Sequence, residues 1–248
     1  PVNDTTGCTG NSLGGTITVN ADGELTITSG NADQEICEDE AIAPINLTLG
    51  GGATNVAISS TSGADISWMI PVISDNTVTI TGTPGADIPS TTYYDYTITT
   101  TGNSCNPAIP IEGTITVNPT PKVIYDVSSG SINQTICEAD PIDAIEFTLE
   151  GTQTANVTGL PGGVTHSISS TGVLTITGTP NGVAADDVFT YTIEPVNNIT
   201  NCVGVPVSGT ISVNALHELT STSGNTDQTL CEGEAIEPIN LTLAGGAT

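Results

Sequence analysis

The stretch TGLPGGVTHSISSTGVLTITGTPNGVAADDVFTYTI, residues 158–193, carries the clearest signal for a fold. Gly and Pro interrupt it at three turns, and Val, Leu, Ile and Phe alternate with polar residues between those turns. A period of two residues is typical of strands that are buried on one face, and Gly and Pro are typical of the turns between strands. The stretch therefore predicts several short β-strands in succession.

The same pattern extends over the chain as internal repeats. The phrases GGTITVN, EGTITVN and SGTISVN end at Asn20, Asn118 and Asn214. The phrases ICEDEAIAPINLTL, ICEADPIDAIEFTL and LCEGEAIEPINLTL begin at Ile36, Ile136 and Leu230. The resulting period of roughly 97 residues is too long for one coil of a solenoid and suits one complete sandwich domain per repeat.

These phrases divide the chain into four parts. Residues 1–20 are expected to finish one repeat, residues 21–118 and 119–214 to form complete repeats, and residues 215–248 to begin another. We therefore expect residues 1–248 to be a section of a longer array. Only a few residues join successive repeats, so we expect the domains to nearly abut and to form a rod.

No segment of the chain carries a helical pattern of apolar residues. In the first complete repeat, Thr-, Val-, Ile- and Tyr-rich runs predict strands at residues 24–28, 34–37, 45–49, 54–59, 66–70, 77–81, 93–99 and 113–117. Seven or eight short strands with regular turn signals are typical of an immunoglobulin-like sandwich. The expected fold class is all-β, with tandem immunoglobulin-like sandwiches.

The charge of the chain excludes several partners. It has 27 acidic side chains and a single basic one, Lys122, for a net charge of −26. Nucleic acid is excluded, because binding phosphate requires clustered Lys and Arg. Docking to an anionic membrane is excluded for the same reason, and no apolar run approaches the roughly 20 residues that cross a bilayer.

Six cysteines recur at regular spacing, one early and one late in each repeat. The early cysteines are Cys37, Cys137 and Cys231, and the late ones are Cys8, Cys105 and Cys202. The absence of a C-x-x-C or paired-His pattern disfavours zinc. Regular cysteines in small β-domains indicate disulfides formed in an oxidising compartment, so we expect an extracellular, cell-surface location.

Two regular pairing schemes are open. In the first, each repeat closes on itself through Cys37–Cys105 and Cys137–Cys202, and Cys8 and Cys231 find partners outside residues 1–248. In the second, each late cysteine bonds to the next repeat through Cys8–Cys37, Cys105–Cys137 and Cys202–Cys231. The ten residues IPIEGTITVN, residues 109–118, would carry the chain roughly 30 Å from Cys105, whereas a disulfide needs Cα atoms within about 7 Å, so we favour the first scheme.

Carboxylates follow each early cysteine. They are Glu38, Asp39 and Glu40, then Glu138, Asp140 and Asp143, and then Glu232, Glu234 and Glu237. Calcium takes six to eight oxygen ligands, so these loops could supply part of a calcium site. The alternative, a solvated acidic face, is favoured because the spacing varies between repeats and no EF-hand pattern is present.

Catalytic residues are not expected. His166 and His217 are not His in the other repeats, and Ser, His and Asp can be picked from any chain this rich in Ser and Asp. Trp68 also occurs in one repeat only, where we expect a core or partly exposed strand residue rather than a platform for sugar. The chain is therefore expected not to be an enzyme.

The turns and the aromatic strand of residues 158–193 resemble the putative-Ig, cadherin-like pattern of bacterial surface proteins. The marks are Gly159, Leu160, Pro161, Gly163 and Gly172, with the GTP motif of residues 178–180 and the strand of residues 189–193. With NQTIC at residues 133–137, the repeat resembles the cysteine-bearing PKD-like repeats of giant secreted Bacteroidota proteins, such as gliding-motility adhesins of the SprB type, exported by type IX secretion.

This resemblance implies a structural role, as a stalk segment of a long cell-surface adhesin or filament involved in attachment or gliding. The implied partners are neighbouring repeats of the same chain, surface glycans and other surface filaments. Two alternatives stay open: a glycan- or ligand-binding module, and a spacer attached to a secreted enzyme. Exposed aromatic residues that recur in every repeat would favour glycan binding, but the chain has one tryptophan.

Overall fold

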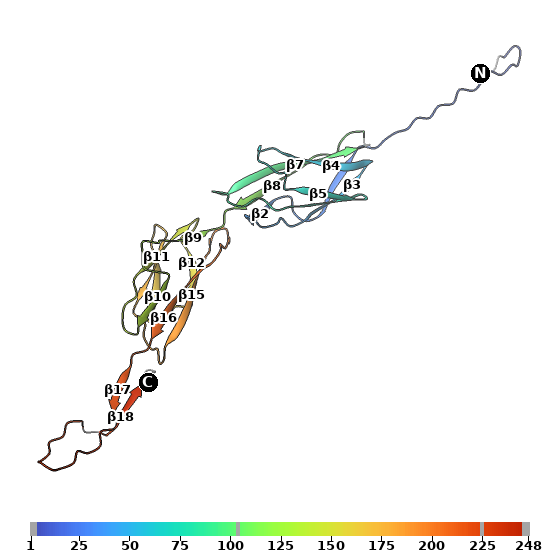
Figure 1. Ribbon diagram of the computed structural model, residues 1–248. Coiled ribbons are helices and arrows are strands. Elements are labelled where there is room, and N and C mark those ends of the chain that lie inside the picture. Colours follow the sequence, from blue (N-terminus) through green and yellow to red (C-terminus); the bar gives the residue numbers. More distant parts are fainter. Residues whose placement is uncertain (1–3, 103–104, 224–225, 245–248) are drawn as a thin grey trace. The chain divides into compact units, whose positions relative to one another are not determined.

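The computed structural model describes residues 4–102, 105–223 and 226–244, and within these ranges every regular element is a strand (Figure 1). The chain separates into two compact units, Pro1–Asn118 and Pro119–Thr248, and each is described by itself. None of the described residues belongs to a helix of the length and apolarity that a membrane span requires.

The first unit contains one sandwich of two four-stranded sheets. Its strands are β1 (Glu24–Ser29), β2 (Gln34–Cys37), β3 (Ile45–Gly50), β4 (Ala53–Ser60), β5 (Ile70–Ser74), β6 (Thr77–Thr81), β7 (Thr92–Gly102) and β8 (Ile111–Asn118). The strand order is β1-β3-β6-β5 in one sheet and β2-β8-β7-β4 in the other. The chain therefore changes sheet between β1 and β2.

The second unit repeats this arrangement. Its strands are β9 (Lys122–Tyr125), β10 (Asn133–Cys137), β11 (Ile145–Glu150), β12 (Ala155–Thr158), β13 (Val164–Ile168), β14 (Val173–Gly178), β15 (Asp187–Pro195) and β16 (Val207–Asn214). The sheets have the orders β9-β11-β14-β13 and β10-β16-β15-β12.

The topology is immunoglobulin-like, which confirms the expected fold class. In both sandwiches the first strand pairs antiparallel within one sheet, and the second strand joins the opposite sheet parallel to the last strand: β2 with β8, and β10 with β16. All other pairs in the two sandwiches are antiparallel.

Alternation along the strands builds each core. In β3, Ile45, Leu47 and Leu49 are buried, and the residues between them are more exposed. The second core uses Ile145, Phe147 and Leu149 at the equivalent positions of β11. Full burial of one such side chain is worth about 1.5–3 kcal/mol, so a period-two pattern of this length is sufficient to fix which face of the strand points inward.

A buried tyrosine locks the start of the second strand in each sandwich. The hydroxyl of Tyr96 on β7 donates a hydrogen bond of 2.7 Å to the carbonyl oxygen of Ala32, and Tyr191 on β15 does the same to Ile132 at 2.9 Å. A glycine of the adjacent strand lies opposite each tyrosine, because the ring crosses the position that a side chain would otherwise fill.

One predicted strand is wrong. Residues 66–69 form a turn, and β5 begins only at Ile70. The side chain of Asp65 accepts a hydrogen bond of 2.9 Å from the Ser67 amide, and the Met69 amide donates to the Ile66 carbonyl at 2.9 Å. This Asx turn outweighs the apolar pattern, and Pro71 is tolerated because β5 is the edge strand of its sheet.

The predicted partial repeats are structured differently from the complete ones. Residues 15–20, which match a closing strand, form no strand here, and Leu13, Ile17 and Val19 are exposed. In the complete repeat, the closing strand β8 pairs with β7. Among the described residues, no strand equivalent to β7 pairs with residues 15–20. At the other end, β17 (Glu218–Ser221) pairs antiparallel with β18 (Leu241–Ala244), as β1 pairs with β3. Residues 1–3, 224–225 and 245–248 of these predicted parts lie outside the described residues.

Candidate functional site

The early cysteine of each sandwich lies at its trailing end, where the chain leaves the last strand. Cys37 is the last residue of β2 and lies opposite Asn118, the last residue of β8. The next amide, of Glu38, donates to the Asn118 carbonyl at 2.8 Å. Cys137 has the same place, opposite Asn214 at the end of β16.

The late cysteine lies at the opposite, leading end, where the chain enters. The Cys105 amide donates to the Ala21 carbonyl at 3.0 Å, and its Sγ lies 3.2 Å from the Asn20 carbonyl oxygen, just before β1. Cys202 follows β15, and two residues later Gly204 packs so closely against the Pro121 carbonyl, just before β9, that a Cβ would overlap it.

This placement corrects the favoured disulfide scheme. Cys37 and Cys202 are disulfide-bonded, whereas Cys8, Cys105, Cys137 and Cys231 are exposed free thiols. The within-repeat pairs Cys37–Cys105 and Cys137–Cys202 are therefore not formed. The reason is distance: β8, with eight residues, separates the two ends of the first sandwich by roughly 25 Å, and a disulfide tolerates about 7 Å between Cα atoms. The second scheme is not formed either, since it requires Cys105 to bond Cys137.

The first carboxylate after each early cysteine holds a loop of its own sandwich. Glu38 is 7% exposed, and its Oε2 accepts a hydrogen bond of 2.9 Å from the Ile88 amide, between β6 and β7. Glu138 accepts from the Val183 amide at 3.1 Å, in the equivalent loop between β14 and β15. A charged acceptor that satisfies a backbone amide in this way is worth more than a neutral one.

The third residue after the cysteine closes a tight turn. Glu40 Oε2 accepts a hydrogen bond of 3.1 Å from the Cys37 amide, and Glu234 does the same for Cys231 at 3.0 Å. The residue two positions after each early cysteine has a left-handed backbone, with φ of 60° at Asp39, 71° at Ala139 and 91° at Gly233. The acidic loop therefore fixes the backbone that carries the cysteine.

Calcium binding stays a prediction. Asp39, Glu40, Asp140 and Asp143 are exposed, and Glu38 and Glu138 turn a carboxylate oxygen toward backbone amides. Across residues 4–102, 105–223 and 226–244, no group of three or more His, Cys, Asp or Glu side chains is arranged to hold a metal ion.

A recurrent glutamine was missed in the sequence. Gln134 donates through Nε2 to the carbonyls of Ser131 (3.0 Å) and Asp143 (2.8 Å), and its Oε1 accepts from the Asp143 amide at 3.0 Å. Gln34 makes the same three contacts with Asn31 and Ala43, and Gln228 makes two of them with Glu237. The signal was present, because a Gln precedes every early cysteine by three residues.

Replacing Gln134 by Leu should destabilise the second sandwich by about 1–2 kcal/mol, because three backbone hydrogen bonds lose their partner at a position that water reaches in part. Urea denaturation followed by circular dichroism measures the change. Gln153→Leu is the matched control, since Gln153 is exposed on the same sandwich. Equal stability of the Gln134 variant and the wild type would show that the clamp contributes nothing.

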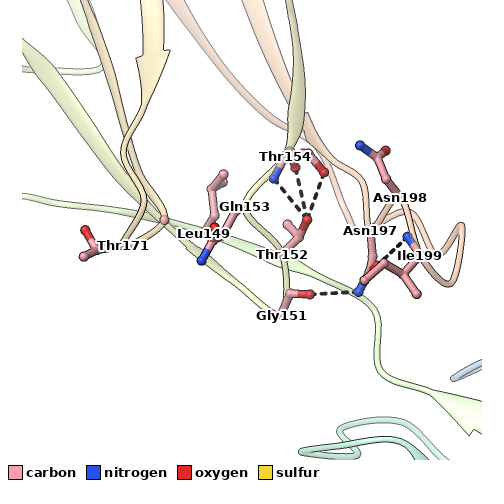
Figure 2. A pocket seen from close by; sticks show the side chains of 10 residues that line it. Leu149, Gly151, Thr152, Gln153, Thr154, Thr171, Asn197, Asn198 and Ile199 are labelled. Carbon is pink, nitrogen blue, oxygen red and sulfur yellow. Dashed lines mark hydrogen bonds between the residues drawn. The ribbon is translucent and has the colours of Figure 1, made fainter.

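An open pocket of about 550 Å³ lies at the leading end of the second sandwich. Three segments line it: Leu149 with residues 151–154, the turn at Thr171–Gly172, and residues 197–199. Asn197 organises it, because its Nδ2 donates to the Gly151 carbonyl at 3.0 Å and its Oδ1 accepts from the Ile199 amide at 3.0 Å (Figure 2). The Thr152 hydroxyl donates to the Val196 carbonyl at 2.6 Å.

The chemistry of this pocket is that of hydroxyl and amide groups. No acidic, basic or cysteine side chain lines it, so the lining residues include no general acid or base that could activate the threonine hydroxyls. Ile199 is 92% exposed at its rim. The arrangement can form hydrogen bonds with a polar ligand, but most of its polar groups already bind the protein backbone.

The remaining candidates from the sequence are separate from one another. His166 lies on β13 and His217 between β16 and β17, and both are exposed. Trp68 is partly buried against the first core and meets the ring of Tyr94 edge-on, with centroids 5.4 Å apart. It is a partly buried packing residue, as expected, but it lies in the turn of residues 66–69 and not on a strand.

No protein-family model and no curated protein matches the chain. Among solved structures, it is similar to human protocadherin-24 EC1-2, with a TM-score of 0.39 and 11% identity over 80% of this chain and 100% of that one. It is also similar to titin domains Z1Z2 in complex with telethonin, with a TM-score of 0.33 and 13% identity over 79% and 97%. A third similarity is to the sialic acid binding region of a Streptococcus sanguinis SK1 adhesin, with a TM-score of 0.33 and 9% identity over 80% and 79%. At these TM-scores and sequence identities, the similarities give no information about activity or ligands.

Proposed function

We propose that this chain is a structural segment without enzymatic activity, a series of immunoglobulin-like modules that acts as a stalk in an extracellular, cell-surface protein. The observation that carries the proposal is duplication. The buried tyrosine, the glutamine clamp and the loop-holding glutamate occur at equivalent places in both sandwiches, and each serves the folding of its own module. Such duplication is expected if each module has the same structural task. A chain that served one active site would need that site in a single module only.

The cell-surface setting rests on composition and on the resemblance described above. A disulfide persists in an oxidising compartment, and a net charge of −26 keeps a dense surface array soluble. A long adhesin or filament of the PKD-like, gliding-motility kind is the finer form of the proposal. Calcium at the acidic loops would be an addition to it, not a requirement.

A glycan-binding module is the second candidate. The pocket at Asn197 favours it, because amides and hydroxyls are the groups that bind sugars. The pocket depends on the residues between Pro195 and Cys202. In the sequence of the first repeat, only two residues separate Gly102 from Cys105. Glycan binding would therefore be a property of one repeat and not of the whole array.

Pulling the full chain by its ends under reducing conditions tests the stalk. Each sandwich should resist and then unfold in one step that releases about 30 nm, because roughly 95 residues extend by about 3.5 Å each. Extension without two such steps would contradict the proposed role as a stalk. A glycan array probed with the same chain, and with Asn198→Ala and Ile199→Ala variants, tests the alternative: binding that both variants lose would favour the glycan-binding module.

A further inference from the structure

We propose that Asn181 is a site of spontaneous deamidation, and that its conversion to isoaspartate opens a loop that Glu138 holds in the second sandwich. Asparagine is a chemically labile residue, and Asn181–Gly182 is the one Asn-Gly pair in the sequence. All of the residues involved belong to the second sandwich. The proposal goes beyond the stalk function and does not depend on it.

The reaction is an intramolecular displacement that needs only water. The backbone nitrogen of Gly182 attacks Cγ of Asn181, the bond from Cγ to Nδ2 breaks, and ammonia leaves with the proton of the Gly182 amide. The product is a five-membered succinimide ring. Water then opens the ring at one of its two carbonyl groups. Opening at one carbonyl gives aspartate, and opening at the other gives isoaspartate, in which the backbone runs through Cβ and Cγ.

The attacking nitrogen is accessible because residue 182 is a glycine. Gly182 is exposed, and a Cβ built on it would meet no atom within 4 Å. Its backbone has a φ of 73°, where a residue with a side chain would be strained. Within the described part of the chain, the Gly182 amide donates no hydrogen bond, so none has to break before the attack.

Asn181 is held in place beside a pair of glycines. Its amide donates a hydrogen bond of 2.9 Å to the Gly162 carbonyl. Its side chain lies so close to this pair that a Cβ at Gly162 would be 3.2 Å from Oδ1, and one at Gly163 would be 2.7 Å from Nδ2. Asn181 is nevertheless exposed, so water can reach the succinimide ring and open it.

Two hydrogen bonds tie this loop to the turn that follows the early cysteine. The Pro180 carbonyl accepts from the Ala139 amide at 3.0 Å, and the Glu138 carboxylate accepts from the Val183 amide at 3.1 Å. Only two residues separate Pro180 from Val183, and they are the reacting pair. The modification would therefore occur between the two points that anchor the loop.

Isoaspartate lengthens the backbone between these two points by one carbon atom. Both hydrogen bonds cannot keep their lengths unless the loop rearranges. We expect the bond between Glu138 and Val183 to open, since an exposed carboxylate can bind water in place of the amide. Aspartate, the other product, keeps the length of the backbone and should leave this hydrogen bond in place.

The first sandwich offers an internal control. Its corresponding loop is held in the same way, because Glu38 accepts a hydrogen bond of 2.9 Å from the Ile88 amide. Gly85 follows the corresponding proline there, so no asparagine is present to react. The change should therefore be confined to the second sandwich.

Ageing of the folded, full-length chain in ¹⁸O-labelled water tests the chemistry. Peptide mapping by mass spectrometry should show one ¹⁸O atom gained at Asn181, and an isoaspartyl methyltransferase should label the same peptide. Labelling should be faster at pH 8 than at pH 6, because the Gly182 amide must lose its proton to attack. Asn198 is the matched control, since it is exposed on the same sandwich and is followed by isoleucine. An unlabelled Asn181, or equal labelling of Asn198, would overturn the proposal.

Hydrogen exchange measured by NMR tests the consequence for the loop. The Val183 amide should exchange faster in the aged chain than in the fresh chain, whereas the Ile88 amide should not change. Asn181→Gln should show no difference on ageing, because its side chain would have to close a six-membered ring. Fresh Asn181→Asp adds the charge without the extra backbone atom and should exchange at Val183 like the fresh wild type. Unchanged exchange at Val183 in an isoaspartyl chain would refute the opening of the loop, and the pulling experiment on the fresh chain would be unaffected.

Discussion

Replacing Gly209 with Ala should destabilise the second sandwich by about 3 kcal/mol or more. Gly209 is buried on β16 opposite Tyr191. An added Cβ would lie 2.5 Å from Cζ of the Tyr191 ring and would also overlap the tyrosine hydroxyl and the Ile132 carbonyl oxygen. Because the carbonyl belongs to the backbone that leads into β10, it cannot yield as a flexible side chain would, and overpacking of this kind costs about 1–3 kcal/mol or more.

Calorimetry of the full chain measures this loss as a shift of the second sandwich's transition. The equivalent Gly113→Ala should shift the first transition by somewhat less, because the added Cβ would lie 2.6 Å from both the Tyr96 hydroxyl and the Ala32 carbonyl oxygen. Ser208→Ala, at the exposed neighbour on β16, should change stability by no more than about 0.5 kcal/mol. Adding Tyr191→Phe to Gly209→Ala should restore little, since the ring and the carbonyl remain. Wild-type stability of Gly209→Ala would refute the packing argument.

The second large effect is a crossover in stability between wild type and Tyr96→Phe at alkaline pH. Burial raises the pKa of Tyr96 to about 12, and the nearby Asp33 carboxylate adds to the shift. Burial likewise raises the pKa of Tyr191 to about 12, with a smaller contribution from Tyr125. An unfolded tyrosine titrates near 10, so the unfolded chain releases the proton first as pH rises.

The sign follows from that order. The stabilisation linked to Tyr96 is fully present below pH 10 and is lost as pH rises through 12, with a total of about 2–3 kcal/mol for a shift of two units. At pH 7, Tyr96→Phe should be about 1–2 kcal/mol less stable than wild type, because the Ala32 carbonyl loses its partner. Above pH 10 the variant has no phenol to ionise at this position. The difference in free energy of unfolding between wild type and variant should therefore shrink and then reverse.

Urea midpoints of the first sandwich between pH 8 and pH 12.5 measure this crossover. Tyr93→Phe is the matched control, because Tyr93 is 59% exposed on the same strand and its loss should change the midpoint little at either extreme. Parallel curves for wild type and Tyr96→Phe over the whole pH range would show that the buried phenol is not linked to folding.

The strands and the fold class could be predicted from the sequence because their cause is local. In β3 the alternation of Ile45, Leu47 and Leu49 fixes the buried face, whatever the rest of the chain does. Repetition of the same phrases at roughly 97-residue intervals then sets the scale of one sandwich. The exception at residues 66–69 also has a local cause. The Asp65 side chain accepts a hydrogen bond from the Ser67 amide, and this favours a turn over a strand.

The sequence by itself thus determined an acidic, all-β chain of repeated immunoglobulin-like modules with two cysteines in each repeat. Only the tertiary structure decided where those cysteines lie. Cys37 is at the trailing end because β2 runs parallel to β8, and Cys105 is at the leading end because its amide bonds Ala21. Sequence spacing records the distance along the chain, but strand direction decides which residues meet in space, and that direction depends on pairing between segments about 80 residues apart.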